Sequence, residues 1–456
     1  MKRLEPACRA PLIFAAVAAV AAAAWAQTCG AQVRLPGVSL PSLPLGGVTQ
    51  TPGLVANGLI DDLTQLRALR VRALVQANRR EIDTDRNGAP VLRGIAVAVA
   101  PGDAALVQAR AAGFGVISDQ SYAALTLRVV TLRAPAHWST REALDRLRKL
   151  DPAGTYEYDH LYDAGGAVSP RDTRLGPPTS AQASSTAAAT PPAATTPATP
   201  APASPPRVGL IDTGIDAAHA VFRDARIHIW GCDGRPVSSD HGTAVASLLV
   251  GDAPPFAGVL PHGEVYAADV YCGRPTGGAA DTIVAAMSWL ASQQVGVINI
   301  SLVGPRDLLL GRAVELAQKR GHIIVAAVGN DGPSAPPLYP AAYPGVVGVT
   351  AVDARHKVLL EACRGPHVSF AAPGADMEGA GVSGSYHALR GTSFAAPIVA
   401  ALLAMTFPAP DPSAAPAHID ALAREAIDLG SPGRDTIYGY GLVGAQYRVP
   451  PAPGVH

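Results

Sequence analysis

Long apolar runs rich in β-branched residues alternate with amphipathic segments in the carboxyl-terminal half of the chain. The runs predict strands at residues 207–212, 265–271, 296–302, 322–328 and 346–352. Helical patterns begin near His241, Asp281, Leu308 and Ser393. Strands that are apolar on both faces and alternate with helices are typical of a parallel sheet covered on both sides. The pattern predicts a doubly wound, mainly parallel α/β domain with its functional groups at the carboxyl ends of the strands.

A second, smaller pattern covers residues 59–163. It opens with leucines at helical spacing, namely Leu59, Leu63, Leu66 and Leu74. Strand-like and helix-like segments then follow in the order β-α-β-β-α-β, at residues 94–100, 103–113, 114–118, 125–132, 139–150 and 155–162. Ser139 and Glu142 form a capping-box pattern at the start of the second helix. We expect a small α+β domain of the split βαβ type.

Segments without a hydrophobic period separate and flank these two patterns. Residues 164–206 are so rich in Pro, Ala, Ser and Thr that they read as a linker. Residues 27–58 form a shorter passage of similar character, which we expect to be flexible. The expected catalytic domain then covers residues 207–446, followed by a tail at 447–456.

The amino end has the pattern of a secretory signal peptide. Lys2 and Arg3 precede an apolar stretch, Pro11–Ala24, and the following "AWAQ" fits cleavage after Ala26. The stretch is short for a membrane span. An uncleaved anchor and a cytosolic chain with an apolar start are the alternatives. We expect residues 1–26 to be removed and the protein to be secreted, into the periplasm or the extracellular medium, without a stable membrane anchor.

Composition gives no electrostatic reason for a nucleic acid or a membrane surface as partner. The 456 residues are 48% hydrophobic and 16% charged, which is enough apolar material for a sizeable core. Lys plus Arg and Asp plus Glu both number 36, so the formal net charge is zero. We expect a globular protein that binds no nucleic acid.

The chain has five cysteines, of which Cys8 would leave with the signal peptide. An exported protein can form disulfides, and Cys232 with Cys272 is the preferred pair, although four cysteines allow three complete pairings. Cys29 and Cys363 stay unassigned. No CxxC or HxxxH spacing indicates a metal site.

The stretch "DTDRNG" at residues 83–88 resembles the start of a calcium loop. However, Gly94 occupies the twelfth position, where such a loop requires a bidentate Glu. We interpret the stretch as a surface turn, and we expect neither a metal nor a cofactor.

Four polar residues stand at ends of the predicted strands and helices. Asp212 ends a strand and Asn330 follows one, whereas His241 and Ser393 begin helices. Each has an ordinary structural explanation as a turn residue or a helix cap. A serine becomes a nucleophile only with a base and an orienting group beside it.

Together, these residues resemble a known family. "VGLIDTGID", "HGTAVAS", "AAVGNDG" and "GTSFAAP" are similar to the four signature segments of the subtilisin-like serine peptidases, in the family's order, and the resemblance covers about residues 207–446. It implies a subtilisin-like fold and an endopeptidase that works through an acyl-enzyme. Ser393 would be the nucleophile, His241 the general base and acid, and Asp212 the group that orients the imidazole. Asn330 would donate to the oxyanion.

The sequence departs from the family pattern in the expected substrate cleft. Ser301, Leu302, Val303 and Gly304 match the strand that lines the cleft, but Val303 stands where the first of two glycines is usual. The shortened segment after Asn330 brings Leu338 close to the expected pocket floor. We therefore expect a narrow pocket and a preference for small residues before the scissile bond.

The small domain lies where subtilases carry a propeptide. The resemblance implies a zymogen whose prodomain inhibits the enzyme intramolecularly, with "YEYDHLY" in the cleft and cleavage somewhere in 163–206. Tyr162 would then face a pocket that we expect to be narrow, so the two expectations conflict.

Two other functions fit the same motifs. One is a non-catalytic binding module with a subtilase fold, although such a module has no need for all four polar residues. The other is a different acyl transfer, such as peptide cyclisation or ester hydrolysis.

Overall fold

The computed structural model describes residues 67–170, 205–254 and 256–449. The expected signal peptide, the flexible segment at 27–58, most of the expected linker and the last residues of the tail lie outside these ranges. Within them, no helix has the length and apolar character needed to cross a membrane.

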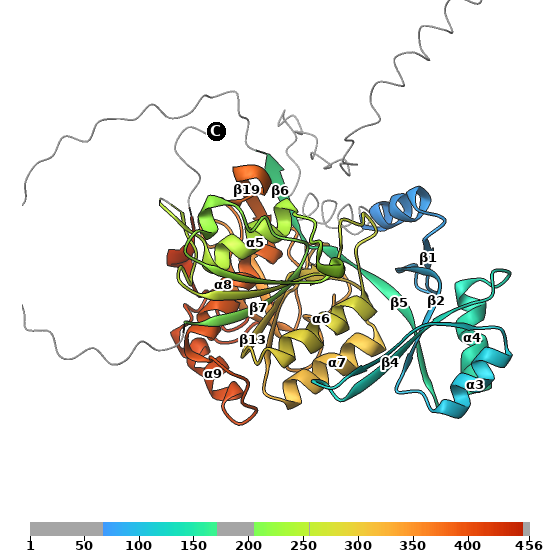
Figure 1. Cartoon of the computed structure of the whole chain (residues 1–456). Helices are drawn as coiled ribbons and strands as arrows, with labels where there is room; N and C mark the ends of the chain where they lie inside the picture. The colour runs from blue at the N-terminus through green and yellow to red at the C-terminus, as the bar shows by residue number, and fades with distance from the viewer. Residues whose placement is uncertain (1–66, 171–204, 255, 450–456) are drawn as a thin grey trace, which may run out of the picture. The chain divides into compact units, whose positions relative to one another are not determined.

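A parallel sheet of seven strands forms the centre of the carboxyl-terminal domain (Figure 1). Every neighbouring pair is parallel, in the order β17-β16-β15-β13-β7-β11-β8. The strands are β7 (Arg207–Asp212), β8 (Arg226–Trp230), β11 (Glu264–Asp269), β13 (Val297–Ile300), β15 (Ile323–Ala327), β16 (Val347–Val352) and β17 (Val368–Pro373). The mixed α/β class expected from the sequence is confirmed.

Helices cover this sheet. They are α5 (Asp240–Val250), α6 (Ala280–Ser292), α7 (Leu308–Lys319), α8 (Thr392–Thr406) and α9 (Ala415–Glu425). Helices α5 and α8 pack against each other, as do α6 and α7, and the two pairs lie on opposite sides of β7 (Figure 1). Helix α8 contacts five strands of this sheet, namely β7, β13, β15, β16 and β17. It is apolar almost all round, as expected of a helix in the middle of a core.

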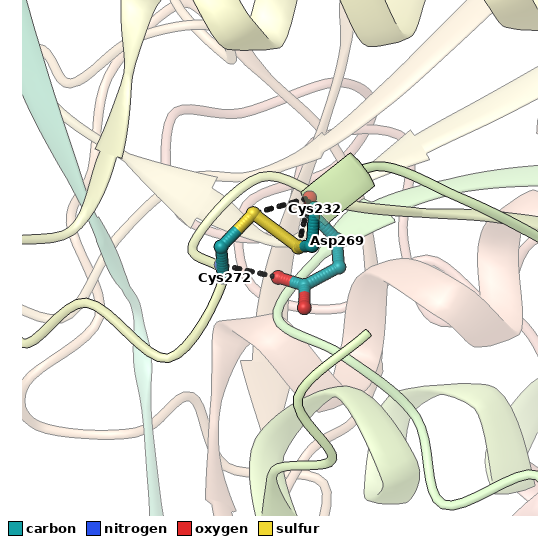
Figure 2. A group of neighbouring side chains, drawn as sticks. All are labelled: Cys232, Asp269 and Cys272. Carbon is teal, nitrogen blue, oxygen red and sulfur yellow. Dashed lines mark hydrogen bonds between the residues drawn. A yellow bond between two sulfur atoms is a disulfide. The ribbon is translucent and has the colours of Figure 1, made fainter. Parts of the chain in front are cut away.

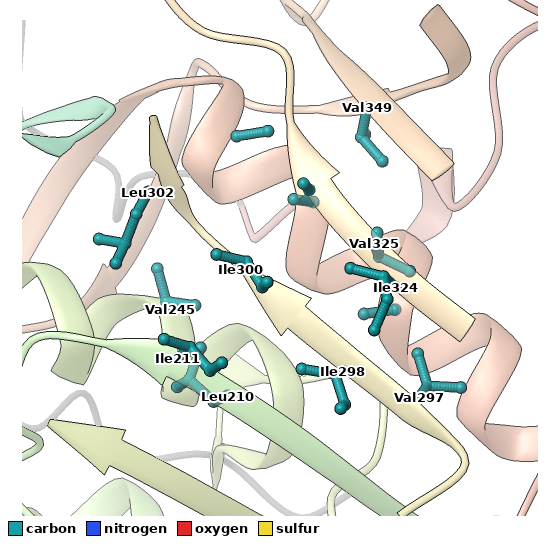
Figure 3. Close-up of a cluster of buried hydrophobic side chains, with 14 of the residues drawn as sticks. Leu210, Ile211, Val245, Val297, Ile298, Ile300, Leu302, Ile324, Val325 and Val349 are labelled. Carbon is teal, nitrogen blue, oxygen red and sulfur yellow. The ribbon is translucent and has the colours of Figure 1, made fainter. Parts of the chain in front are cut away.

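The core consists of the apolar strand residues and the helix faces that cover them. Leu210, Ile211, Ile298 and Ile300 are fully buried, and Figure 3 shows them beside Val245 of α5. Each such side chain stabilises the fold by roughly 1.5–3 kcal/mol when it leaves water. The continuous apolar runs in the sequence thus form strands that are buried on both faces.

The N-terminal domain (residues 67–164) has an antiparallel sheet with strand order β5-β2-β4-β3. A helix at residues 67–77 precedes it. The elements are β1 (Ile82–Thr84), β2 (Pro90–Val99), α3 (Asp103–Ala111), β3 (Gly115–Tyr122), β4 (Leu127–Arg133), α4 (Thr140–Leu150) and β5 (Thr155–Ala164). The capping box of Ser139 and Glu142 is present at α4. Helices α3 and α4 bury Leu106, Leu144 and Leu147 in a separate apolar cluster with the sheet.

The ordered chain continues past residue 164, where we expected the linker to begin. Residues Gly166–Pro170 form β6, which pairs with β19 (Tyr386–Gly391). Strand β19 also pairs with β18 (Met377–Ala380). The expected linker boundary is therefore wrong by several residues, because backbone pairing orders this segment and composition does not record such pairing.

Cys232 and Cys272 form a disulfide (Figure 2), which confirms the preferred pair. Asp269 holds the loops beside it, since one carboxylate oxygen accepts from the Cys272 N–H at 2.9 Å and the other from the Val237 N–H at 3.1 Å. The sulfurs are bonded to each other, so they are not thiolate ligands for a metal. Cys363 is a free, buried thiol, and burial raises its pKa to about 12.

The stretch at residues 83–88 comprises the last two residues of β1 and the start of the turn that leads to β2. The Asp85 carboxylate accepts from the N–H groups of Asn87 and Ala89, both at 2.8 Å. It closes its own turn in the manner of an Asx-turn. Asp85 is buried, however, so this is not a purely surface turn.

Candidate active site

Asp212 and His241 meet at the carboxyl end of β7. Asp212 is the last residue of that strand, and its buried Oδ1 lies 2.8 Å from Nδ1 of His241. The Thr213 N–H donates to the same oxygen at 2.6 Å. An ionised carboxylate can only accept, so Nδ1 carries a proton and Nε2 of the neutral ring presents a lone pair.

Helix α5 fixes His241 because the first turn of this helix packs directly on the loop that follows β7. The Gly242 N–H donates to Thr213 Oγ1 at 2.8 Å. A Cβ atom at Gly242 would collide with the backbone oxygen of Thr213, so only glycine allows this approach. The imidazole also packs on the Phe394 ring, with centroids 5.3 Å apart.

Ser393 is the second residue of α8 and is fully buried. Gly391, whose φ is 143°, makes the sharp change from β19 into the helix. The Ser393 hydroxyl donates to the backbone oxygen of Ser301 at 3.2 Å. Nε2 of His241 has no hydrogen-bond partner among the described residues. The structure thus joins Asp212 to His241, and in it the Ser393 hydroxyl is directed to Ser301.

Asn330 follows β15 and faces the start of α8. Its Oδ1 accepts from the Thr392 N–H at 3.1 Å, which fixes the orientation of the amide. Its Nδ2 is buried and has no partner among the described residues. A buried donor without an acceptor costs free energy. Such a donor is suited to an oxygen that gains negative charge during a reaction.

Strand β5 lies between two short strands of the carboxyl-terminal domain. It pairs with β12 (Gly278–Ala279) and with β14 (Leu302–Val303). In the register, Tyr162 is opposite Gly278 and Asp163 is opposite Val303. Leu302 and Val303, two of the expected substrate-binding residues, therefore contact a strand of the same chain.

The remaining expected cleft residues lie close by. Gly304 exchanges two backbone hydrogen bonds with Tyr339, at 2.9 and 3.0 Å. Leu338 is buried and packs against Gly329, the neighbour of Asn330. Ser301 is buried between β13 and β14, and its hydroxyl donates to the Ser393 carbonyl oxygen at 2.9 Å.

Tyr162 does not face the space beside Val303 where we expected a narrow pocket. Its ring is fully buried against Gly304, and its hydroxyl donates to the Pro305 carbonyl at 2.9 Å. The Tyr271 hydroxyl donates to the Tyr162 carbonyl at 2.9 Å. The conflict expected from the sequence is therefore absent, because Tyr162 lies further along the cleft.

Sequence reasoning missed a buried charged cluster between the two domains. His160 of β5 lies with Nδ1 2.8 Å from Asp307 Oδ2 and Nε2 3.4 Å from Asp85 Oδ2. Burial by itself would lower the pKa of His160, but the hydrogen bonds to Asp307 and Asp85 outweigh it and raise the pKa to about 10. The three residues belong to distant segments, so no local pattern could have indicated them.

The helix at residues 67–77 makes a further charged contact near the site. Arg67 and Arg70 both pair with Asp331, the residue after Asn330. Asp331 is almost fully buried. Residues 59–66 of the expected helix lie outside the described residues.

Comparison with known proteins places this chain in a family. The model of the subtilase family matches residues 204–441. Subtilisin DY of Bacillus licheniformis is 31% identical over 248 residues, which cover 53% of this chain and 89% of that protein. The minor extracellular protease Epr of Bacillus subtilis (strain 168) is 31% identical over 212 residues, which cover 46% of this chain. The match spans only 32% of Epr's length.

Among solved structures, fervidolysin from Fervidobacterium pennivorans, a keratinolytic enzyme related to subtilisin, has a TM-score of 0.62. The match covers 82% of this chain and 64% of fervidolysin at 19% identity, so it supports the fold alone. The family model covers more than half of the chain, and the four matching polar residues lie within it. The chain belongs to the subtilase family.

Proposed function

We propose that this protein is a serine endopeptidase that hydrolyses peptide bonds through an acyl-enzyme. The 2.8 Å contact between Asp212 and His241 carries the proposal, because it orients an imidazole whose Nε2 is free to accept a proton. Ser393 is the nucleophile, and Asn330 Nδ2 donates to the oxyanion. In this reaction Asp212 stabilises the imidazolium that forms on proton transfer.

Catalysis requires one rearrangement. The Ser393 hydroxyl donates to Ser301 in the structure, and rotation about its χ1 bond redirects it. Catalytic hydrogen bonds are often long or absent before a substrate is correctly seated. We infer that this rotation brings the hydroxyl to His241 Nε2.

The N-terminal domain acts as an intramolecular inhibitor of a zymogen in this proposal. Strand β5 occupies the cleft between β12 and β14, where an extended substrate would add as a strand. Asp159 of the same strand accepts from the Asp281 N–H at 3.2 Å, at the start of α6. His160 binds Asp307, the N-cap of α7. These contacts seat the strand and exclude other peptides.

We further propose that the protein is secreted. The signal-like pattern at residues 1–26 supports this. The disulfide between Cys232 and Cys272 supports it as well, because such bonds persist in oxidising compartments. The expected preference for small residues before the scissile bond belongs to the same proposal, and buried Val303 supports it.

The decisive test replaces Ser393 with Ala. We expect turnover of a protein substrate to fall about a million-fold, since a triad acts as a unit. Fluorophosphonate labelling of the purified protein should disappear, and the precursor should stay unprocessed. Ser431→Ala, at an exposed serine, serves as the matched control.

Residual turnover near the wild-type rate would overturn the assignment of Ser393. If the wild-type protein is neither labelled nor active on proteins, the chain is a binding module with this fold. Mass spectrometry of the products separates hydrolysis from cyclisation, because hydrolysis adds one water.

A further inference from the structure

The chain runs through the cleft as two strands, β5 and β6, which are separated by a single residue. Strand β5 ends at Ala164, which is opposite Leu302 of β14. Strand β6 begins at Gly166, which is opposite Gly391 of β19. Gly165 lies between the two strands, and Gly391 is two residues before Ser393. A continuous extended segment is therefore held on both sides of the nucleophile.

Gly165 lies against the nucleophile itself. A Cβ atom built on Gly165 would be 2.9 Å from Ser393 Oγ and 3.5 Å from each of the two methyl groups of Val303. Cβ would thus already touch Val303. Any larger side chain directed there would need the space that the methyl groups of Val303 fill. Glycine is the residue that fits between Ser393 and Val303 without displacing either.

Tyr162 fixes the register of this segment. Its buried ring, its hydrogen bond to Pro305 and the pairing with Gly278 hold it three residues before Gly165. A slip of the strand by one residue would remove the ring from this place and turn every side chain to the other face. Tyr162 therefore selects which residue reaches Ser393.

We propose that the peptide bond between Gly165 and Gly166 is the bond that this enzyme cleaves in its own chain, an inference that rests on the proposed function. By the same geometry, its substrates are peptides with glycine immediately before the scissile bond. Val303 is the specificity-determining residue, since it occupies the space that a larger side chain at that position requires.

The reaction balances as an ordinary peptide hydrolysis. Ser393 Oγ bonds to the Gly165 carbonyl carbon while its proton passes to His241 Nε2. The bond from that carbon to the Gly166 nitrogen then breaks, and the nitrogen takes the proton from His241. A water molecule attacks the acyl-enzyme and gives its proton to His241. The Gly165 carboxylate leaves and Ser393 regains its proton.

The first experiment offers the processed enzyme a synthetic peptide with the sequence of residues 155–170. Mass spectrometry should find one product that ends at Gly165 and another that begins at Gly166. Substituting Phe for Gly165 in the peptide should lower kcat/KM by at least about 100-fold, a discrimination of the size that pocket sterics supply. Equal or faster cleavage of the Phe peptide, or cleavage of the original peptide only at another bond, would overturn the proposal.

Two further peptides test the register. Replacing Tyr162 with Ala should slow cleavage after Gly165 by about tenfold or more, because the buried ring is lost. Replacing Tyr156 with Ala is the matched control, since that ring packs in the core of the N-terminal domain. Equal effects of the two replacements would contradict an anchoring role for Tyr162.

The enzyme variant Val303→Gly tests the specificity residue. It should bring the rates on the Phe and Gly peptides to within about tenfold of each other, since the space beside the scissile bond opens. Val237→Gly, at an exposed valine, is the matched control and should keep the wild-type ratio. An unchanged ratio in Val303→Gly would show that another group sets the preference.

The full-length chain supplies the last test. Wild-type precursor sampled early in processing should yield a new amino terminus at Gly166, and Gly165→Val should block that cleavage. Persistent cleavage after residue 165 in the variant would overturn the proposal. The peptide assays remain decisive if this variant does not fold. Fluorophosphonate labelling separates the two failures, because a labelled enzyme that cleaves elsewhere refutes this inference and leaves the endopeptidase proposal intact.

Discussion

In the proposed mechanism, Asn330 illustrates how a single residue is positioned before the reaction. Its oxygen is occupied by the Thr392 N–H at the start of α8, so its Nδ2 has only one direction in which to point. That nitrogen is buried without a partner among the described residues. A donor held in place before the reaction needs no reorganisation when negative charge develops.

We predict that Asn330→Ala lowers kcat by about 10²–10³ and changes KM little, because the lost hydrogen bond is made mainly in the transition state. Steady-state kinetics on the peptide of residues 155–170 measures both parameters. Asn330→Asp keeps the side-chain shape but lacks the amide donor, so it should be at least as slow as the Ala variant. A rise in KM at unchanged kcat would instead assign Asn330 to substrate binding.

At the scale of elements, β5 is the strand of the N-terminal sheet that also pairs with strands of the carboxyl-terminal domain. It pairs with β2 in its own domain and with β12 and β14 in the other. His160 extends this connection to the turn after β1 and to the N-cap of α7. Glu157 of the same strand adds a further negative charge near His160. The charged imidazole is thus surrounded by acidic groups.

This cluster predicts a pH dependence of precursor stability. The pKa of His160 is about 10 in the folded protein and that of an unperturbed histidine is about 6.5. The stability that protonated His160 contributes to the folded precursor is therefore complete below about pH 6.5, and it is lost as the pH rises through about 10. In the Ser393→Ala precursor, the free energy of unfolding measured in urea should fall between pH 7 and 10 more steeply than in the same protein with His160→Gln. Parallel curves for the two proteins would contradict the prediction.

At the scale of the whole molecule, the carboxyl-terminal domain combines a large apolar core with one covalent link. The disulfide joins the loop after β8 to the loop after β11, across a sequence separation of 40 residues. Closing a loop of this length restricts the unfolded chain and stabilises the fold by about 4 kcal/mol in the chain-entropy model. This value is an upper bound, because residual structure in the unfolded state reduces it.

The corresponding variant replaces Cys232 and Cys272 together by Ser in the Ser393→Ala background. Its free energy of unfolding should decrease by up to about 4 kcal/mol in denaturant titrations. The Ser393→Ala protein with both cysteines intact, once it is reduced with dithiothreitol, should unfold at nearly the same denaturant concentration as the double variant. An unchanged midpoint after complete reduction would show that the bond adds no stability.

Much of the fold was predictable because its signals are local. Apolar runs such as 207–212 and 296–302 form strands wherever both faces are buried, so the α/β class followed from the pattern. The pairing of Cys232 with Cys272 was the preferred one among three and is confirmed. Asp212 and His241 were recognised from short motifs, and the structure brings them into contact.

The sequence by itself determined which segments become strands and helices and which residue types bear the chemistry, since both depend on neighbours along the chain. Only the tertiary structure decided that Gly165 lies against Ser393, that the Tyr162 ring packs against Gly304, and that His160 meets two carboxylates. These arrangements follow from backbone pairing between distant segments. Backbone hydrogen bonds are chemically alike for almost every residue, so their register leaves no local trace in the amino-acid sequence.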